Sequence, residues 1–232
     1  MQKSSSLLPY SSMPVAAIIP AHNEGALILN VLEVLHQDDS LYEIIIVDDG
    51  STDDTLEKSR QYAQTDPRVR VLRHDVNEGK GQALVTGWSA TRAPILLFLD
   101  ADLIGLQSRH VRSLIQPVLE DRVDMSVGLF RGGQLFTDLS HLVTPWLSGQ
   151  RCLKADLLKS VSMKAAAGYG IETAITLTSR DDRWRCCYVY LKGVTHPHSE
   201  IHRGFGKGVK NRFRMYTEIL RAWWIIGTAK LS

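Results

Sequence analysis

The segment Ile95–Asp102 places the tightest constraint on the fold, because a short apolar run follows Pro94 and ends in two carboxylates. Such a run predicts a buried strand that reaches the surface at its carboxyl end. Asp100 and Asp102 repel each other there, and a hard divalent cation removes this repulsion by taking carboxylate oxygens as ligands. Such a cation keeps positions open for phosphate oxygens, so we expect a diphosphate partner. The alternative is a strand end with two solvated acids.

Length and composition favour a single α/β unit in a reducing compartment. The 232 residues, 44% of them hydrophobic, supply enough material for one large core. A net charge of +2 gives no general bias toward nucleic acid. Three cysteines do not make a disulfide framework, so we expect a cytoplasmic protein. The sequence shows no run long enough to span a membrane and no signal-peptide pattern.

Strand and helix patterns alternate through the first half of the chain. Apolar runs predict strands at Val15–Ile19, Glu43–Val47 and Val69–Leu72, each followed by a segment with helical signals. This alternation is typical of a doubly wound, mostly parallel sheet flanked by helices. Ligands of such sheets bind beyond the carboxyl ends of the strands. We therefore expect one edge of the sheet to carry Pro20–Glu24, Asp48 with Asp49, and Asp100 with Asp102.

The polar residues at this edge suit a nucleoside diphosphate. A carboxylate can accept the imino hydrogen of uracil or guanine, which makes Asp49 or Asp48 a candidate base reader. Gly79 and Lys80 open a helix, whose amides and dipole suit phosphate, and Lys80 adds a positive charge. Each feature alone is more often a helix cap or an ordinary loop. Their combination indicates a nucleotide site.

Four motifs carry a specific resemblance: Ile18–Glu24, Ile46–Asp53, Asn77–Gly81 and Leu99–Asp102. In this order and spacing they resemble a family-2-type glycosyltransferase with the GT-A fold, a Rossmann-like mixed sheet. The resemblance implies a UDP- or GDP-linked hexose donor, with Mg²⁺ or Mn²⁺ bound at Asp100-Ala101-Asp102. It also implies donor contacts from Pro20, Ala21, Asn23, Glu24 and Asp49.

Two segments of the second half extend the resemblance. Leu147–Leu153 is similar to the Ser-Gly-x-Arg segment behind the donor sugar, where Arg151 would neutralise the departing diphosphate; the alternative is an ordinary loop ion pair. Ala167–Thr173 resembles the acceptor-side segment of dolichyl-phosphate mannosyltransferase-like and glucosyl-3-phosphoglycerate synthase-like enzymes, and it brings Glu172 toward the acceptor.

The role of Glu172 stays open, because inverting relatives often carry a Glu-Asp pair where this chain has Glu172 and Thr173. Glu172 could act as general base with inversion of the anomeric centre. It could instead orient the donor sugar, with retention. A phosphate acceptor, already ionised, would need no strong base.

A third metal ligand is expected after a late strand at Arg185–Leu191. His196 stands in a Gly-Val-x-His context similar to that of the family, and His198 is its rival. Imidazole is a more usual partner for Mn²⁺ than for Mg²⁺. A zinc cluster of the nearby histidines is not favoured, because no cysteine or acid completes a closed tetrahedral site.

The last segment, residues 203–232, combines basic residues with Trp223 and Trp224 at an apolar end. This pattern predicts an amphipathic helix on an anionic membrane surface. The alternative is a terminal helix packed on the sheet. We thus expect a tail at residues 1–13, a GT-A domain at 14–202 and this basic helix.

The predicted function is metal-dependent transfer of a hexose from a nucleotide sugar to a lipid or polyprenyl phosphate at the inner, cytosolic membrane face. A soluble enzyme with a small phosphorylated acceptor is the second hypothesis, and a non-catalytic sugar-nucleotide or membrane-binding module is the third. A nucleotidyltransferase ranks lower, because Pro20–Glu24 occupies the place of its Gly-rich phosphate loop. No nucleic-acid partner is expected, and a homodimer is left open.

Overall fold

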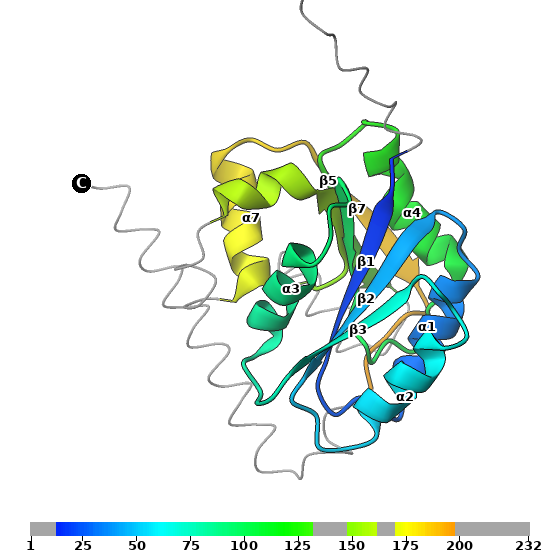
Figure 1. Cartoon of the computed structure of the whole chain (residues 1–232). Helices are drawn as coiled ribbons and strands as arrows, with labels where there is room; N and C mark the ends of the chain where they lie inside the picture. The colour runs from blue at the N-terminus through cyan, green and yellow to red at the C-terminus, as the bar shows by residue number, and fades with distance from the viewer. Residues whose placement is uncertain (1–12, 132–147, 162–169, 198–232) are drawn as a thin grey trace, which may run out of the picture.

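A seven-stranded sheet forms the centre of the computed structural model, which describes residues 13–131, 148–161 and 170–197 (Figure 1). The strand order is β3-β2-β1-β4-β6-β5-β7, and within it only β6 runs antiparallel to its neighbours. The strands are β1 (Val15–Ala21), β2 (Leu41–Asp49), β3 (Val69–His74), β4 (Ile95–Phe98), β5 (Met125–Arg131), β6 (Arg151–Lys154) and β7 (Cys186–Lys192). This mixed, mostly parallel sheet confirms the predicted fold class.

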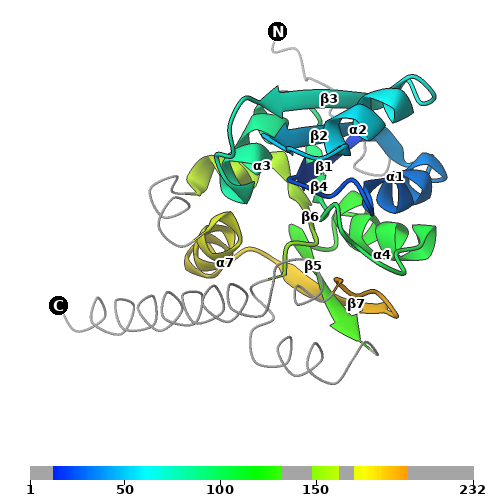
Figure 2. The ribbon, with the colours of Figure 1, turned by 90° about the horizontal axis from the view of Figure 1, so that it is seen from below.

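Helices cover both faces of the sheet (Figures 1 and 2). One face packs against α1 (Ile28–His36), α2 (Thr55–Ala63) and α4 (Ser108–Leu119). The other packs against α3 (Lys80–Ser89) and α7 (Ile171–Asp181), with a short 3₁₀ helix at Ala155–Ser160. Because both faces are covered, the central strands read as continuous apolar runs rather than as alternating patterns.

The central strands β1 and β4 are buried along their whole length, and their register fixes the edge where the polar motifs meet. Ile18 pairs with Ile45 of β2 on one side and with Phe98 of β4 on the other. All three strands run parallel, so their carboxyl ends reach the same edge of the sheet. The predicted strands at Val15, Glu43, Val69, Ile95 and Arg185 are all present, with bounds that differ by a few residues.

The sequence prediction missed β6. Leu147–Leu153, which the resemblance places behind the donor sugar, contains the start of this strand: from Arg151 the chain runs antiparallel between β4 and β5. β6 has only four residues and begins with the buried Arg151, so its sequence shows no strand pattern. It is a strand because it pairs with β4 and β5. As a result, the loop at Ser148–Gln150 arrives at the carboxyl end of β4.

Two predicted segments lie outside the described residues: the tail, apart from Met13, and the basic helix at 203–232, where the second domain boundary was also placed. Both stay predictions. In the part of the chain that the structure describes, none of the helices combines the length and the apolar character required to cross a lipid bilayer.

Gly87 of α3 allows this helix to pack closely on the sheet, because a Cβ at this position would overlap Ile18 Cγ2 and lie 3.2 Å from Val47 Cγ2. We predict that Gly87→Ala lowers the free energy of unfolding by about 1–3 kcal/mol through overpacking. Urea denaturation measures this change. Gly81→Ala in the same helix is the control, since its Cβ would come no closer than 3.8 Å to Ile171 Cβ. Equal destabilisation by both variants would contradict the prediction.

Asp66 joins the loops at the amino ends of the strands. Its buried carboxylate accepts hydrogen bonds from Arg68 Nη2 at 2.8 Å and from His36 Nδ1 at 2.8 Å. The Arg68 guanidinium holds the pKa of Asp66 well below its usual range, and the bond from His36 lowers it further, although burial opposes this.

We predict that Asp66→Asn lowers the free energy of unfolding by about 1.5–3 kcal/mol at neutral pH. Because the folded-state pKa is depressed, this stabilisation is present above the unfolded-state pKa of about 3.9 and is lost as the pH falls through the lower folded value. Wild type and variant should therefore converge in urea denaturation at acidic pH. A difference that persists undiminished there would show that the charge is not responsible.

Candidate active site

The acidic pair at the end of β4 lies among cationic and amide groups. Asp100 accepts hydrogen bonds from Lys80 Nζ at 2.6 Å and from Gln150 Nε2 at 2.8 Å. His196 Nε2 lies 3.5 Å from the same carboxylate. Burial alone would raise the pKa of Asp100, but Lys80 and His196 lower it, so that its carboxyl is ionised at neutral pH.

His196 follows β7 and reaches the acids because its segment pairs with the loop after β4. Backbone hydrogen bonds join Ile104 and Thr195 in an antiparallel bridge. Gly105 makes this approach possible: its φ is +76°, and a Cβ there would overlap the Gly193 carbonyl oxygen.

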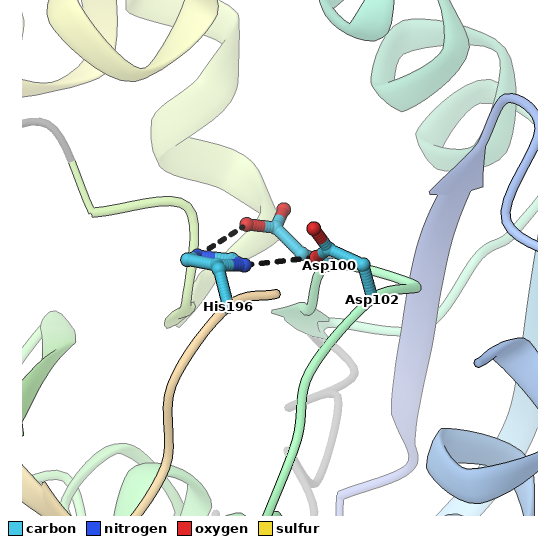
Figure 3. A group of neighbouring side chains, drawn as sticks. All are labelled: Asp100, Asp102 and His196. Carbon is cyan, nitrogen blue, oxygen red and sulfur yellow. Dashed lines mark hydrogen bonds and ion pairs between the residues drawn. The ribbon is translucent and has the colours of Figure 1, made fainter. Parts of the chain in front are cut away.

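The imidazole of His196 donates from Nδ1 to Asp102 Oδ1 at 2.9 Å, as Figure 3 shows. Its ring also packs edge-on against Phe130, with 5.0 Å between the ring centroids. Burial lowers the pKa of His196, but the bond to Asp102 and the charge of Asp100 raise it above its ordinary value. The two carboxylates and the imidazole thus form one electrostatic unit.

Asp100, Asp102 and His196 fit a divalent metal ion. Each offers one ligand atom, and these atoms lie within 4.8 Å of one another. Two carboxylate oxygens and one imidazole nitrogen form a donor set that suits Mn²⁺ and, less typically, Mg²⁺. The structure therefore brings together the three predicted ligands, while His198 lies outside the described residues.

Lys80, the first residue of α3, connects this unit to Glu172 in the first turn of α7. Its Nζ lies 2.6 Å from Asp100 Oδ1 and 2.8 Å from Glu172 Oε1. Burial would lower the pKa of Lys80, but the two carboxylates raise it well above its usual range. Gly149 leaves space for this ion pair, because a Cβ there would lie 2.6 Å from Lys80 Nζ and 2.8 Å from Asp100 Oδ1.

Glu172 is therefore engaged as an ion-pair partner. Burial would raise its pKa, but Lys80 lowers it below the ordinary value. The carboxylate is ionised and lies against Lys80. Its predicted place beside the acceptor stays a prediction. Its lowered pKa makes it a weak proton acceptor while it is paired with Lys80.

Arg151 is buried below the site. Its Nε donates to the Ser148 carbonyl at 2.8 Å, and its Nη1 donates to Thr176 Oγ1 at 3.0 Å. Burial lowers the pKa of Arg151 to about 10, which leaves it protonated at neutral pH. These contacts hold the Ser148–Gln150 loop against α7. The predicted role of Arg151 beside the diphosphate stays a prediction.

The loop after β1 is folded by Asn23, whose φ of +58° places it in the left-handed region. Its Oδ1 accepts hydrogen bonds from the backbone N–H groups of Thr52 at 2.8 Å and Asp53 at 3.3 Å. The adjacent Glu24 N–H donates to Thr55 Oγ1 at 2.8 Å. Asn23 thus shapes the loop, while Glu24 reaches the cavity beside it.

A cavity of about 390 Å³ lies along this edge, within the size range of small-ligand pockets. Most of the predicted site residues line it. The predicted residues that do not line it are Asn23, Asp48, Gly79, Arg151 and Glu172. Sequence reasoning missed His22 and Asn77, although both stand inside quoted motifs. The lining consists of Pro20, Ala21, His22, Glu24, Asp49, Asn77, Lys80, Asp100, Ala101, Asp102 and His196.

The neighbours Asp48 and Asp49 point to opposite faces of β2. Asp49 lines the cavity. Asp48 is fully buried, with Arg73 Nε 4.0 Å from Oδ2 and no hydrogen-bond partner for either oxygen among the described residues. Of the two candidate base readers, only Asp49 lies at the cavity.

Comparisons with known proteins agree with this geometry. A family model described as glycosyl transferase family 2 matches residues 16–170. Glucosyl-3-phosphoglycerate synthase of Mycobacterium tuberculosis is 28% identical over 200 residues, which cover 72% of this chain and 61% of that protein. A dolichyl-phosphate beta-glucosyltransferase of Trichomonas vaginalis is 36% identical over 101 residues, which cover 40% of this chain and 31% of that protein.

Solved structures show the same similarity over more of the chain. The crystal structure of the Mycobacterium tuberculosis synthase in complex with Mn²⁺, uridine diphosphate and phosphoglyceric acid matches with a TM-score of 0.70 at 26% sequence identity. The match covers 92% of this chain and 79% of that chain. Since the chain spans less than two thirds of each of the two curated relatives, the comparisons identify fold and family and leave the whole reaction to experiment.

We predict that Asp102→Asn weakens Mn²⁺ binding by about tenfold or more, because the substitution removes a charged oxygen ligand. Electron paramagnetic resonance of free Mn²⁺ measures the affinity. The matched control is Asp54→Asn, an exposed acid paired with Lys58 away from the site. Equal affinities for the two variants would place the ion elsewhere.

Proposed function

The chain belongs to glycosyl transferase family 2, and we propose that it transfers a hexose from a nucleoside-diphosphate sugar to an acceptor that carries a phosphate group. The observation that carries this proposal is the convergence of Asp100, Asp102 and His196 beside Lys80, at one cavity along the carboxyl ends of the strands. Intact ligands and an intact ion pair argue against a non-catalytic binding module.

The donor would occupy the cavity lengthwise. Its base would lie near His22, which follows β1, Asp49, which ends β2, and Asn77, which lies in the loop between β3 and α3. Its diphosphate would lie at Asp100 and Asp102. A nucleoside diphosphate has a flat base and a ribose at one end and a charged diphosphate at the other. The cavity has a matching division, with loop residues at one end and the two metal-binding acids at the other.

Asp100, Asp102 and His196 would hold Mn²⁺ or Mg²⁺. When bound, such an ion stabilises the negative charge that develops on a departing diphosphate. Lys80, the first residue of α3, adds a second positive charge on the side that faces Glu172. This arrangement supports the predicted metal dependence.

Glu172 bears on the acceptor. A carboxylate paired with Lys80 and with a lowered pKa is a weak general base. The site therefore suits a nucleophile that is already ionised, or a reaction in which the departing phosphate takes the proton. Glu172 would hold Lys80 and the donor sugar in place, which favours the orienting role among the alternatives open from sequence.

Two acceptors have the required phosphate, and a different observation favours each. A small phosphorylated acid is favoured by the similarity to the synthase structure that contains phosphoglyceric acid, which covers most of this chain. A lipid or polyprenyl phosphate at the cytosolic membrane face is favoured by the basic, Trp-containing segment at 203–232 and by the dolichyl-phosphate relative. The second acceptor would make the protein a peripheral membrane enzyme.

We predict that the purified full chain, with Mn²⁺, forms a glycosylated product from UDP-glucose or GDP-mannose with phosphoglyceric acid or with polyprenyl phosphate in detergent. Mass spectrometry of both acceptor arms identifies the product and so separates the two sources of phosphate. We expect Lys80→Met to lower the rate by about 100-fold to 1000-fold, because it removes a preorganised charge.

Lys159→Met is the matched control, because its ion pair with Asp156 is exposed. No product from either acceptor with either donor would refute the proposed function. An equal rate for the two lysine variants would refute the role of Lys80.

A further inference from the structure

Asp49 lines the cavity, yet its carboxylate is already occupied by donors from the protein. Oδ1 accepts the backbone N–H of Glu78 at 2.9 Å, and Oδ2 accepts that of Gly79 at 2.8 Å. His74 Nδ1 lies 2.8 Å from Oδ1. A carboxylate offers about four lone-pair sites, so at least three are used within the chain. Only 2% of Asp49 is exposed.

His74 is held on both sides of its ring. Because an ionised carboxylate can only accept a hydrogen bond, Nδ1 must donate to Asp49. Nε2 pairs with Thr86 Oγ1 of α3 at 2.9 Å. The imidazole is 9% exposed, and it joins the end of β2 to the second turn of the helix that begins with Lys80. These contacts form the Asp49 network. It runs from Asp49 through His74 to Thr86 and includes the Glu78 and Gly79 amides.

The backbones of the two loops also meet at this point. Gly50, directly after Asp49, has a φ of +65°. A Cβ there would lie 2.6 Å from the Val76 carbonyl carbon and 2.7 Å from the Asn77 nitrogen. Only glycine allows this approach without displacement of the backbone. The turn before α3 is thus fixed by a close contact as well as by hydrogen bonds.

The Asp49 network ends one residue from Lys80. Gly79, which donates to Asp49, has a φ of +93° and is the N-cap of α3. The next residue, Lys80, extends its ammonium group to Asp100 and Glu172. A shift of the Glu78–Gly79 turn would therefore move the Cα of Lys80 and, with it, the ammonium group.

We propose that Asp49 and His74 are positioning residues that fix the Glu78–Gly79 turn and thereby place Lys80 against Asp100 and Glu172. This inference rests on the proposed transfer reaction, and it gives Asp49 a role different from the base reader expected from the sequence. The lowered pKa of Asp49 supports it: burial would raise the value, but the bonds from Glu78, His74 and Gly79 lower it, which keeps the acceptor charged.

Amide hydrogen exchange tests the network without any substrate. Asp49→Asn replaces one acceptor oxygen with a donor, so the Glu78 and Gly79 amides should exchange on the order of tenfold faster or more. His74→Leu should have a similar but smaller effect. His74→Asn should restore slow exchange, because the asparagine amide nitrogen stands as many bonds from Cβ as Nδ1 does. Unchanged exchange in Asp49→Asn would overturn the proposal.

The chain offers a matched control in Asp66→Asn. Asp66 and His36 form a pair at the same 2.8 Å, and the side chains of Asp66 and Asp49 are 2% and 3% exposed. This pair lies at the amino ends of the strands, away from Lys80. Asp66→Asn should lower stability without faster exchange at Glu78 and Gly79.

A double-mutant cycle with Lys80→Met tests the positioning role. Asp49→Asn should lower kcat by about tenfold to 100-fold in the wild-type background, on the scale of other supporting contacts. It should change kcat less than about twofold in the Lys80→Met background, because residues that act as a unit are not additive. The ratio of kcat/KM for a UDP-hexose to that for a GDP-hexose should stay the same in Asp49→Asn.

Two results would overturn the positioning role: a full loss of kcat by Asp49→Asn in the Lys80→Met background, or a changed ratio between the two nucleotides, which would identify a base reader. Absence of transfer by the wild type would refute the proposed function and, with it, the catalytic part of this inference. The exchange measurement would still decide whether the Asp49 network fixes the turn, so the two failures are distinguishable.

Discussion

The ion pairs of Lys80 with Asp100 and Glu172 are the interaction on which the rest of the site depends. Two carboxylates from distant parts of the sequence share one ammonium group, at 2.6 and 2.8 Å. Without this ammonium group, burial would raise the pKa of both acids, and the charge of Asp100 would raise that of Glu172 further. Lys80 instead keeps both carboxyls ionised, with lowered pKa values. The arrangement of these charged groups therefore depends on the position of Lys80, which is the first residue of α3.

The fold provides the necessary approaches through small residues and one antiparallel strand. β6 inserts between β4 and β5 and delivers Gly149 and Gln150 to Asp100. β5 and β7 then run parallel to β4 again, which brings His196 to the same edge from the far end of the sheet. Glycine at 105 and 149 leaves space for the neighbouring segments. The site thus depends both on pairing between distant strands and on glycines whose missing Cβ atoms let neighbouring segments approach closely.

The sequence predicted those parts of the site that local patterns determine. The ends of the buried apolar strands can be recognised in the sequence. The acid pair, Lys80 and the loop after β1 could therefore be placed together at the carboxyl edge of the sheet. His196 came from a family resemblance, and the geometry brings it to the acids. β6 and the contact from Gln150 were missed, because both depend on pairing between residues far apart in the sequence; Gln150 and Asp100 are 50 positions apart. The choice between Asp48 and Asp49 needed the pleat of β2, which composition does not reveal.

The charge of the cavity constrains what can enter it. Its lining includes four carboxylates, those of Glu24, Asp49, Asp100 and Asp102, but a single ammonium group, that of Lys80, besides two imidazoles. A nucleoside diphosphate is itself an anion and would be repelled by this excess of negative charge. A divalent cation held by Asp100, Asp102 and His196 would reverse the balance where the acids are densest and would leave the base end of the cavity unchanged. Donor binding and cation binding should therefore be coupled, because each reduces the electrostatic cost of the other.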